Sequence, residues 1–298
     1  MVDSRSDYLT ACWQEKVREA ASQKITCRVF TAFNTNVDVV VHINNDNLKR
    51  ILERNPALKE KKLEEDFSRQ ADIIDTPEAF ITMLLGAMQK GKSLYALTNC
   101  NGFLTWLEES FSEAKEILGG QAGIVANQIS SLDAQAVVYS RLLSPKQAAL
   151  FRDDVLAPKI ENNQLILEPV KKVSRATDQC KINWIFEYAK GITIKFGDLT
   201  ITTPRANRVI LATRPKDAIM SFSDEMMSYL PQLGKQIDLA FMAGYHYISE
   251  NNPDGRNYQE FIDKAIKEIE ALREENPNLA FHYEYVPMKA RNLEAKTL

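Results

Sequence analysis

Leu118–Asn127 (LGGQAGIVAN) is the stretch of sequence around which the rest of the chain is organised. Two adjacent glycines and one polar residue precede a third glycine and an apolar run. Glycine adopts positive φ angles without strain and lets a ligand approach the main chain closely. The pattern predicts a turn at Gly119 and Gly120 that leads into a helix, whose free N–H groups and dipole favour an anionic or oxygen-rich ligand. An alternative is purely structural: Gly119 ends a helix over residues 104–118, and a buried helix follows.

The composition is that of an ordinary globular protein. The chain has 298 residues, 45% hydrophobic and 26% charged, which is enough for one large or two modest domains. A formal net charge of −3 argues against a broad nucleic-acid-binding surface, and no apolar run approaches the length of a membrane span. The cysteines form neither a CxxC motif nor a zinc-type spacing. We therefore expect a cytoplasmic protein with reduced thiols that binds neither nucleic acid nor membrane.

Alternating helix and strand patterns predict an α/β core. Strand patterns cover residues 27–33, 37–43, 136–139, 208–213, 236–242 and 279–286. Helical patterns cover residues 6–22, 104–118, 145–156, 222–232 and 257–275. One more helix is predicted to begin at Pro77, because Thr76 is a good capping residue and proline is favoured at the first helical position. Such alternation is typical of a doubly wound sheet.

Two segments interrupt this core. Residues 44–76 are strongly polar, and the strand pattern at 182–188 is followed by a hairpin pattern over 192–203 whose turn is Gly197-Asp198. We therefore expect a larger α/β domain and a smaller α+β domain. The larger domain comprises residues 1–41, 112–150 and 204–298, and the smaller one comprises residues 42–111 and 151–203.

Polar side chains follow the predicted strands, where ligands bind in open α/β sheets. Asn34, Asn36 and Asp38 come after the strand over 27–33, and together they supply the donors and acceptors that sugar hydroxyls need. A simple Asx-turn between two strands would also explain them. The remaining candidates are two arginines suited to phosphate and one carboxylate suited to Mg²⁺ beside phosphates: Arg205, Arg208 and Glu284.

Six motifs occur in an order that resembles one family. They are Phe33–Asp38 (FNTNVD), Gly119–Asn127 (GGQAGIVAN), Asn183–Tyr188 (NWIFEY), Pro204–Arg208 (PRANR), Ala243–His246 (AGYH) and His282–Glu284 (HYE). Together they resemble the archaeal ADP-dependent sugar kinases, which are the glucokinases and phosphofructokinases of the ribokinase-like superfamily. The resemblance covers the whole chain. It implies a ribokinase-like doubly wound α/β domain closed by a smaller α+β lid, and transfer of the β-phosphoryl group of ADP to a sugar hydroxyl with Mg²⁺.

The resemblance also implies roles for individual residues. Arg205 would contact the transferred phosphate, and Glu284 would belong to the metal network. Substrate binding would fall to Asn34, Asn36, Asp38, Gly119, Gly120, Gln121, Asn127 and Asn183. Phosphoryl transfer depends mainly on positioning and charge neutralisation, which agrees with this mixture of amides, backbone turns and an arginine.

One departure from the family pattern concerns the catalytic aspartate. The family carries it in a Gly-x-Gly-Asp motif, preceded by Asn-x-x-Glu, and both lie downstream of the His-x-Glu motif. The sequence stops at Leu298, and its one Gly-Asp pair is Gly197-Asp198 in the predicted hairpin turn. Asn257–Glu260 (NYQE) matches by spelling, but a helix cap explains it better. We therefore expect a C-terminally shortened chain that lacks the catalytic aspartate and is inactive.

Residues of the predicted lid indicate which sugar is the substrate. The resemblance implies that glucokinases place a glutamate on the first lid helix, whereas the fructose 6-phosphate enzymes have a small residue there. Here the helix after Glu78 carries no acid through Ala96, and Gly86 lies near the expected position. A histidine expected in glucokinases is replaced near Asn183, and Lys190 is placed to neutralise the sugar phosphate. These features favour fructose 6-phosphate over glucose.

Other functions stay open at this point. An ADP-dependent glucokinase would share most of the motifs, and a non-catalytic sugar-phosphate-binding remnant would keep the binding residues without turnover. A vitamin or nucleoside kinase would use ATP with a smaller lid, which the long insertion over 44–111 argues against. A purely structural protein would need no polar groups at strand ends. We also expect exposed apolar surface near residues 279–286, which would favour self-association.

Overall fold

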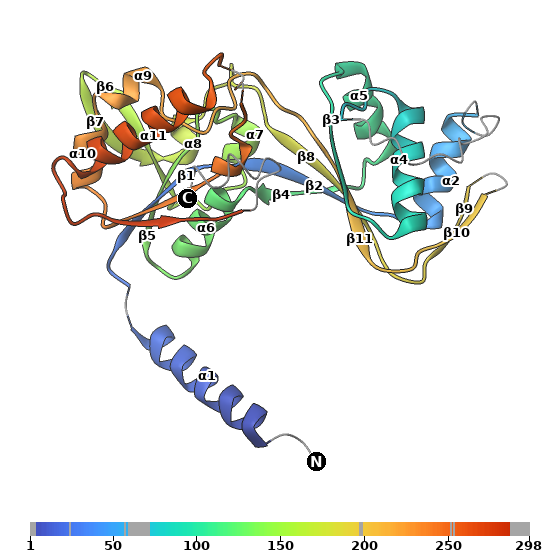
Figure 1. Ribbon diagram of the computed structural model, residues 1–298, viewed down its shortest axis with the longest axis horizontal. Helices are drawn as coiled ribbons and strands as arrows, with labels where there is room; N and C mark the ends of the chain where they lie inside the picture. The colour runs from blue at the N-terminus through green and yellow to red at the C-terminus, as the bar shows by residue number, and fades with distance from the viewer. Residues whose placement is uncertain are drawn as a thin grey trace.

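The computed structural model describes residues 4–23, 25–56, 58, 72–196, 199–250, 252 and 254–286. These residues form two lobes joined by long strands, and a separate N-terminal helix extends away from both (Figure 1). Each lobe is built on its own β-sheet, with helices packed against it. The mixed α/β architecture predicted from the sequence is therefore confirmed, with a larger and a smaller lobe.

The large lobe contains a six-stranded sheet in the order β13-β12-β1-β5-β6-β7. Its neighbouring strands are parallel, except that β7 runs antiparallel to β6. The carboxyl ends of β1, β12 and β13 therefore meet at one edge, where ligands bind in this class of sheet. The strands are β1 (Arg28–Phe33), β5 (Gln135–Tyr139), β6 (Leu156–Glu161), β7 (Gln164–Pro169), β12 (Leu239–Ala243) and β13 (Ala280–Tyr283).

Helices cover both faces of the large sheet, with α6 on one side and α9, α10 and α11 on the other (Figure 1). The core beneath α11 contains aromatic rings: Phe222 packs on Phe30 at 5.9 Å and on Phe33 at 4.9 Å between ring centroids. Asn257 and Glu260 form a capping box at the start of α11, as expected. The helices are α6 (Gln121–Ser131), α7 (Pro145–Ala148), α8 (Val170–Val173), α9 (Asp224–Met227), α10 (Leu230–Lys235), α11 (Tyr258–Arg273) and the short 3₁₀ helix η1 (Tyr245–Tyr247).

The small lobe contains a five-stranded sheet in the order β3-β11-β8-β2-β4 and a separate hairpin. β8 runs parallel to β2 and antiparallel to β11. The strands are β2 (Asn36–His42), β3 (Leu94–Leu97), β4 (Lys115–Gly119), β8 (Ile182–Tyr188) and β11 (Asn207–Ala212), with β9 (Thr193–Phe196) and β10 (Leu199–Thr202) in the hairpin. The hairpin strands are those predicted, and the turn residues Gly197-Asp198 lie outside the described residues.

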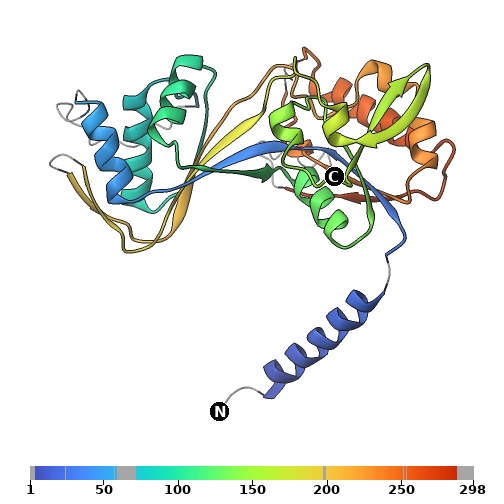
Figure 2. The same cartoon turned by 180° about the vertical axis from the view of Figure 1, so that it is seen from behind.

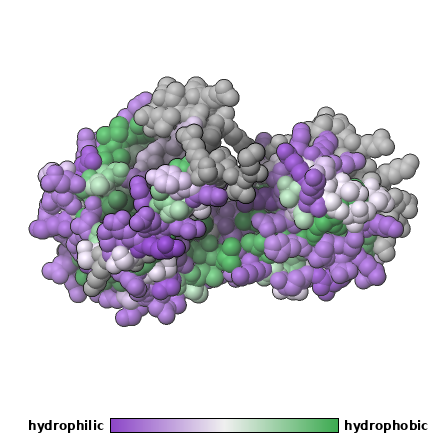
Figure 3. Space-filling view, turned by 90° about the horizontal axis from the view of Figure 1, so that it is seen from below, coloured by the Kyte–Doolittle hydropathy of each residue, from purple (hydrophilic) through white to green (hydrophobic). Residues whose placement is uncertain are grey.

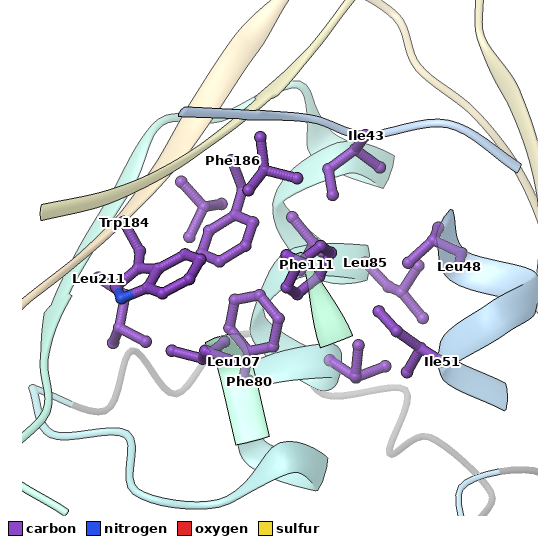
Figure 4. Close-up of a cluster of buried hydrophobic side chains, with 14 of the residues drawn as sticks. Ile43, Leu48, Ile51, Phe80, Leu85, Leu107, Phe111, Trp184, Phe186 and Leu211 are labelled. Carbon is purple, nitrogen blue, oxygen red and sulfur yellow. The ribbon is translucent and has the colours of Figure 1, made fainter. Parts of the chain in front are cut away.

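Three helices cover one face of the small sheet: α2 (Asn45–Arg54), α4 (Pro77–Lys90) and α5 (Asn101–Ser110). Alternate residues of β2 and β8 point into this core, where the ring of Phe186 lies 4.6 Å from that of Phe80 and 5.1 Å from that of Phe111 (Figure 4). Thr76 caps α4 as predicted, and Gly91 ends it with a left-handed φ of 61°. The opposite face of the sheet carries the polar residues of the site.

Several predicted elements differ in the structure. Residues 104–118 are not one helix: α5 ends at Ser110, and Lys115–Gly119 is β4, which pairs antiparallel with β2. The helix predicted over 145–156 is limited to α7, and the one predicted over 222–232 is replaced by the short helices α9 and α10. In each case the apolar residues have helical spacing over a short segment, but packing against a sheet determines which secondary structure the segment adopts.

The division between the lobes also differs from the prediction. Residues 156–169 form β6 and β7 of the large sheet, although they were assigned to the smaller domain. Conversely, β2, β4 and β11 belong to the small sheet, although most of their residues were assigned to the larger domain. The physical reason is that the chain passes between the lobes in very short connections at strand ends, such as Asn34 and Thr35 between β1 and β2, so a composition change does not mark the boundary.

The edges of the molecule expose apolar side chains. α1 (Ser4–Ser22) stands away from both lobes in two opposite views (Figures 1 and 2), with Trp13 68% exposed. β13 is the terminal strand of the large sheet; Tyr283, its last residue, and Tyr285, which follows it, are 36% and 49% exposed, as expected for this edge. Most of the visible surface is hydrophilic, with apolar side chains between the lobes (Figure 3).

Within the described residues, no helix is both long and apolar enough to cross a bilayer.

Candidate functional site

The chain crosses between the two lobes twice at one place. β1 of the large sheet continues through Asn34 and Thr35 into β2 of the small sheet, and β4 of the small sheet continues through Gly120 into α6. Gly120 has a φ of +76°, and a Cβ there would lie 2.3 Å from the carbonyl oxygen of Asn34. That carbonyl accepts a hydrogen bond of 3.0 Å from the N–H of Ala122. The predicted glycine turn is therefore confirmed, and it fixes the first turn of α6 against the end of β1.

Gly119 makes room for the polar side chains of β2. It pairs with Asn36 across the β2–β4 ladder, and a Cβ at Gly119 would lie 2.3 Å from both the Nδ2 of Asn36 and the Cγ of Asp38. Such a distance is far below a van der Waals contact, so a larger residue would displace both side chains. Glycine is therefore required at the two adjacent positions for different reasons. At position 120 the backbone has a positive φ angle, and at position 119 there is no space for a side chain.

A cluster of hydrogen-bonded amides and one carboxylate lies at this crossing. The Nδ2 of Asn36 donates to the Oδ1 of Asp38 at 2.5 Å, and the Nδ2 of Asn183 donates to the same oxygen at 3.0 Å. The amide of Asn34 donates to the Oε1 of Gln121. Asn183 reaches the cluster because β8 pairs with β2 in the register Asp38 to Asn183. Five residues expected to bind the sugar are thus brought together.

The cluster has hydrogen-bond acceptors that remain free to bind a ligand. Asp38 has further lone pairs, since its hydrogen bonds to side-chain amides fall on Oδ1, and the Oδ1 of Asn183 is buried without a partner in the described structure. Burial raises the pKa of Asp38, and the hydrogen bonds from Asn183 and Asn36 and the charges of Lys181 and Arg208 act in the opposite direction. A carboxylate in this setting is a strong acceptor for hydroxyl donors.

Two cations adjoin the amide cluster. Lys181 is 3% exposed, and its Nζ donates to the Oδ1 of Asn34. Arg214 donates from its Nη2 to the hydroxyl of Tyr95 at 2.7 Å. Burial and the neighbouring charge of Arg214 hold the pKa of Lys181 well below its usual range. Neither cation forms a salt bridge within the part of the chain that the structure describes.

Neither Lys181 nor Arg214 is among the site residues predicted from the sequence, although a signal was available. Lys181 directly precedes the strand pattern at 182–188, and Arg214 directly follows the one at 208–213. The hairpin between these strands makes them antiparallel, so the start of one lies beside the end of the other. In the structure the N–H of Thr213 donates to the carbonyl of Ile182 at 2.8 Å, which brings the two cations to the same end of the sheet.

Arg205 and Lys190 lie at the opposite end of the same two strands, so the roles predicted for them require correction. Asn207, close to Arg205, pairs with Tyr188, close to Lys190, whereas Asn183 pairs with Ala212. Ala212 lies five residue steps along the strand from Asn207, roughly 17 Å of extended chain. Arg205 instead donates from its Nε to the carbonyl of Gly91, at the end of α4. Lys190 is exposed in the turn after β8.

Asn127 also differs from its prediction. Its Nδ2 donates to the carbonyl of Leu150 at 3.1 Å, and its Oδ1 accepts from the N–H of Arg152 at 3.0 Å. Both ends of this amide are therefore used to hold the loop after α7 against α6. Asn127 supports the scaffold of the site and does not join the polar cluster.

Glu284 follows the carboxyl end of β13, at the same edge of the large sheet as Asn34. Its N–H donates to the carbonyl of Met242 at 3.0 Å, and its Oε2 is buried without a partner among the described residues. Burial raises the pKa of Glu284. Across the described ranges, no group of three or more His, Cys, Asp or Glu side chains is arranged to hold a metal ion. His282 is stacked on Phe241, with ring centroids 5.1 Å apart.

Two cavities lie near the small sheet. One of about 680 Å³ is lined by Arg214, Lys216 and Gln179, beside the cation pair. The other, of about 630 Å³, is lined by His42, Glu187 and Arg208, toward the far end of the sheet. Arg214 lines the first of these cavities, whereas Lys181 lines a separate, much smaller cavity together with Thr35 and Met220 at the crossing of the lobes. We therefore place the candidate site at the crossing of the lobes.

These features define a two-lobed α/β protein with a polar, cation-containing site between a large sheet and a lid sheet. The family model for the "ADP-specific Phosphofructokinase/Glucokinase conserved region" matches residues 27–297. The chain therefore belongs to the ADP-specific phosphofructokinase/glucokinase family, and the ribokinase-like α/β fold expected from the sequence is confirmed.

Curated relatives span both branches of the family. The ADP-specific phosphofructokinase of Pyrococcus furiosus is 30% identical over 272 residues, which are 91% of this chain and 59% of the relative. That of Thermococcus litoralis is 32% identical over 274 residues, again 91% of this chain and 59% of the relative. The ADP-dependent glucose/glucosamine kinase of Pyrococcus abyssi is 22% identical over 281 residues, 92% and 58% of the two chains. The chain spans about three fifths of the length of these relatives.

Solved structures agree with this assignment. A hypothetical ADP-dependent phosphofructokinase from Pyrococcus horikoshii OT3 superposes with a TM-score of 0.77 at 27% identity, covering 92% of this chain and 60% of the other. An ADP-dependent kinase in complex with fructose 6-phosphate and ADPβS superposes with a TM-score of 0.73 at 29% identity, covering 95% and 56%. The similarity therefore includes both lobes of the chain.

Proposed function

We propose that this chain supplies the sugar-phosphate site of an ADP-dependent 6-phosphofructokinase, which transfers the β-phosphoryl group of ADP to fructose 6-phosphate. The observation that carries the proposal is the pair Lys181 and Arg214, two cations without a salt-bridge partner beside a cluster of amides and a carboxylate. Lys181 is buried and Arg214 is half-buried, and an anionic substrate supplies the opposite charge that a buried cation needs. The phosphofructokinase relatives, and the similar kinase bound to fructose 6-phosphate, support the same substrate class.

Different residues of the site would bind different parts of the substrate. Asp38 and Asn183 offer free acceptor positions to the sugar hydroxyls, and Asn36 holds the carboxylate of Asp38 in place. Lys181 and Arg214 neutralise the 6-phosphate. Because Asn34 contacts Lys181 on one side and Gln121 on the other, it joins the phosphate end to the first turn of α6. This arrangement orients the sugar, which is the main protein contribution to phosphoryl transfer.

Glu284 would hold Mg²⁺ through its side-chain carboxylate. Its buried oxygen without a partner fits this role, since Mg²⁺ is commonly bound through one or two carboxylates, substrate phosphates and water. The ion would supply neutralisation of the charge on the transferring phosphoryl group. Its position at the edge where β1, β12 and β13 end is compatible with a nucleotide approaching from that side.

We further propose that the chain alone binds the sugar phosphate without turnover. The cluster contains one carboxylate, Asp38, which is assigned above to binding the sugar hydroxyls, and the cluster has no second carboxylate to act as general base. Loss of a general base typically lowers the rate by about 10²–10⁴-fold. An assay of the purified chain with ADP, Mg²⁺ and fructose 6-phosphate should therefore give no appreciable fructose 1,6-bisphosphate. Substantial turnover would show that another residue acts as the base.

The binding proposal is tested by isothermal titration calorimetry of the chain with fructose 6-phosphate and with glucose. We expect binding of the phosphorylated sugar that weakens as the salt concentration rises, because two charge-assisted contacts are involved. The second candidate function, an ADP-dependent glucokinase, is favoured by the glucose/glucosamine kinase relative. Glucose binding without fructose 6-phosphate binding would select that function, and binding of neither sugar would overturn both.

A further inference from the structure

Tyr247 stands between the two lobes in the short helix η1, directly after β12. Gly244, which precedes η1, has a φ of +108°. A Cβ on Gly244 would lie 2.8 Å from the Sδ of Met220 and 3.0 Å from the Cβ of Asn34. The turn that carries Tyr247 is therefore held closely against the end of β1, where Asn34 meets Lys181. Its place relative to the amide cluster is fixed by packing and not by a flexible loop.

The ring of Tyr247 contacts both cations of the candidate site. Its centroid lies 4.0 Å from the Cζ of Arg214 and 4.8 Å from the Nζ of Lys181. Both distances are within the range over which the negative face of an aromatic ring attracts a cation. Within the described residues, Tyr247 is the one ring that lies over both Lys181 and Arg214.

Neighbouring groups hold this ring in place. The ring of His246 lies 4.1 Å from that of Tyr247 between centroids. Burial, together with the charges of Lys181 and Arg214, lowers the pKa of His246 to about 4, so the imidazole is neutral at physiological pH and adds no third positive charge. Tyr95 holds the other side of Arg214 through its hydroxyl. Arg214 is thus held by neutral aromatic groups, whereas Lys181 is also held by Asn34 and feels the charge of Asp38 in the amide cluster.

We propose that Tyr247 is a positioning residue that holds Lys181 and Arg214 side by side as a preformed anion site, and so favours phosphorylated over neutral sugars. This inference rests on the proposed function in one respect, namely that the anion is the 6-phosphate of the sugar. Without a ring between them, two cations with no salt-bridge partner repel each other and move apart. A carboxylate at position 247 would also hold them, but it would compete with the phosphate for the same charges. An aromatic ring holds the cations and leaves their charge available.

The test compares Tyr247→Phe, which keeps the ring, with Tyr247→Leu, which removes it. Affinities for fructose 6-phosphate, inorganic phosphate and glucose are measured by calorimetry on the full chain. We expect Tyr247→Leu to weaken binding of both phosphate-containing ligands about tenfold, as loss of a desolvated cation–π contact implies, and Tyr247→Phe to stay within about twofold of the unmodified chain. Any glucose binding should be the same in all three proteins. Tyr229→Leu, the same change at a half-buried tyrosine in the large-lobe core, serves as the matched control.

The selectivity ratio separates positioning from a structural effect. A general loosening of the fold would weaken the binding of phosphorylated and neutral sugars alike. Loss of the cation arrangement would weaken only the binding of phosphorylated sugars. Equal fructose 6-phosphate affinity in Tyr247→Leu and the unmodified chain would overturn the proposal, and so would an equal loss in Tyr247→Phe. Should Tyr247→Leu fail to fold, Tyr247→Met offers a flexible ring-free side chain for the same measurement.

The ligand series also keeps this inference distinct from the proposed function. If the unmodified chain binds inorganic phosphate but not fructose 6-phosphate, the proposed substrate is wrong. The comparison of Tyr247→Leu with Tyr247→Phe then still decides the role of Tyr247 from phosphate alone. If the unmodified chain binds neither ligand, Lys181 and Arg214 do not form an anion site and both proposals are overturned.

Discussion

Gly120 and Asn34 are in contact where the chain passes between the lobes for the second time, with the Cα of Gly120 so close that a Cβ would lie 2.3 Å from the Asn34 carbonyl oxygen. Asn34 is also the residue whose side chain joins Lys181 to Gln121. One backbone contact therefore aligns the end of β1, the start of α6 and the buried cation. The architecture of the site depends on this crossing more than on any single polar side chain.

The first prediction concerns Gly120→Ala. The substitution adds a Cβ to a residue with a φ of +76° and places it against backbone, which cannot move away as a side-chain tip can. Strain at positive φ costs about 1–2 kcal/mol, and overpacking typically costs 1–3 kcal/mol more. We expect a clear fall in the free energy of unfolding, measured by urea denaturation. Gly102→Ala is the control: it lies in α5 with no atom within 4 Å of the added Cβ, and should be neutral or slightly stabilising.

The second prediction concerns the cation pair. Lys181→Met keeps most of the buried stem but removes the charge, so we expect fructose 6-phosphate binding to weaken by about tenfold to a hundredfold, the effect of one charge-assisted hydrogen bond. Lys190→Ala is the matched control, since Lys190 lies at the far end of β8. Calorimetry measures both. A large loss with Lys190→Ala and none with Lys181→Met would place the phosphate at the other end of the sheet.

The third prediction separates Arg205 from the site. Its Nε donates to the carbonyl of Gly91, which ends α4, so Arg205→Ala should affect the small lobe and not sugar binding. We expect a loss of roughly 1 kcal/mol in the free energy of unfolding, typical of one hydrogen bond, with unchanged fructose 6-phosphate affinity. Arg214→Ala should show weakened affinity instead. If Arg205→Ala abolished sugar binding, the assignment of the cation pair would be wrong.

The fourth prediction concerns Glu268, a carboxyl of α11 that is 0% exposed and accepts a hydrogen bond of 3.0 Å from the N–H of Phe222. Burial raises the pKa of Glu268 to about 7, and Lys264, 3.9 Å away, offsets only part of this. The unfolded chain releases the proton at lower pH than the folded one. The free energy of unfolding should therefore fall as pH rises from about 4.5 to about 7, by roughly 3 kcal/mol, and then level off.

Glu268→Gln isolates this effect. The amide keeps an acceptor for Phe222 and cannot ionise, so the variant should gain stability relative to the unmodified chain as pH rises through the same window. His246 acts in the opposite direction, because its lowered pKa makes stability fall as pH falls below 6.5, but both proteins share that contribution. Urea denaturation at about pH 5 and about pH 8 measures the difference. A difference that does not change with pH would mean that Glu268 is ionised in the folded chain.

The sequence was most informative where a residue acts through its local backbone. Gly119 and Gly120, and the amides of Asn34 and Asn36, could be predicted because they follow a strand pattern or precede a helix within a few residues. Lys181 and Arg214 are 33 positions apart, and they meet only through the register of β8 and β11. The residues predicted from the sequence to bind phosphate, Lys190 and Arg205, lie instead at the opposite end of these two strands.

Secondary structure was mispredicted for a related reason. Lys115–Gly119 contains apolar residues that continue the helical spacing of α5, but the segment is stabilised as a strand by pairing with β2. That pairing is also what brings Gly119 to Asn36 and Asp38. Tertiary contacts of this kind cannot be predicted from the local pattern, because over a short segment the same apolar residues fit the spacing of a helix and that of a strand.

The last prediction concerns the protonation of Asp38. When ionised, its carboxylate accepts hydrogen bonds from sugar hydroxyls most strongly while it holds the amides of Asn36 and Asn183. Burial raises its pKa, so sugar binding should weaken on acidification at a higher pH than an ordinary aspartate would cause. Asp38→Asn cannot ionise and should bind the sugar more weakly, by about tenfold, with this acid-side dependence removed. Calorimetry with fructose 6-phosphate across the acidic range measures both. An acid-side loss that persists unchanged in Asp38→Asn would assign it instead to the second ionisation of the sugar phosphate, near pH 6 for phosphate esters.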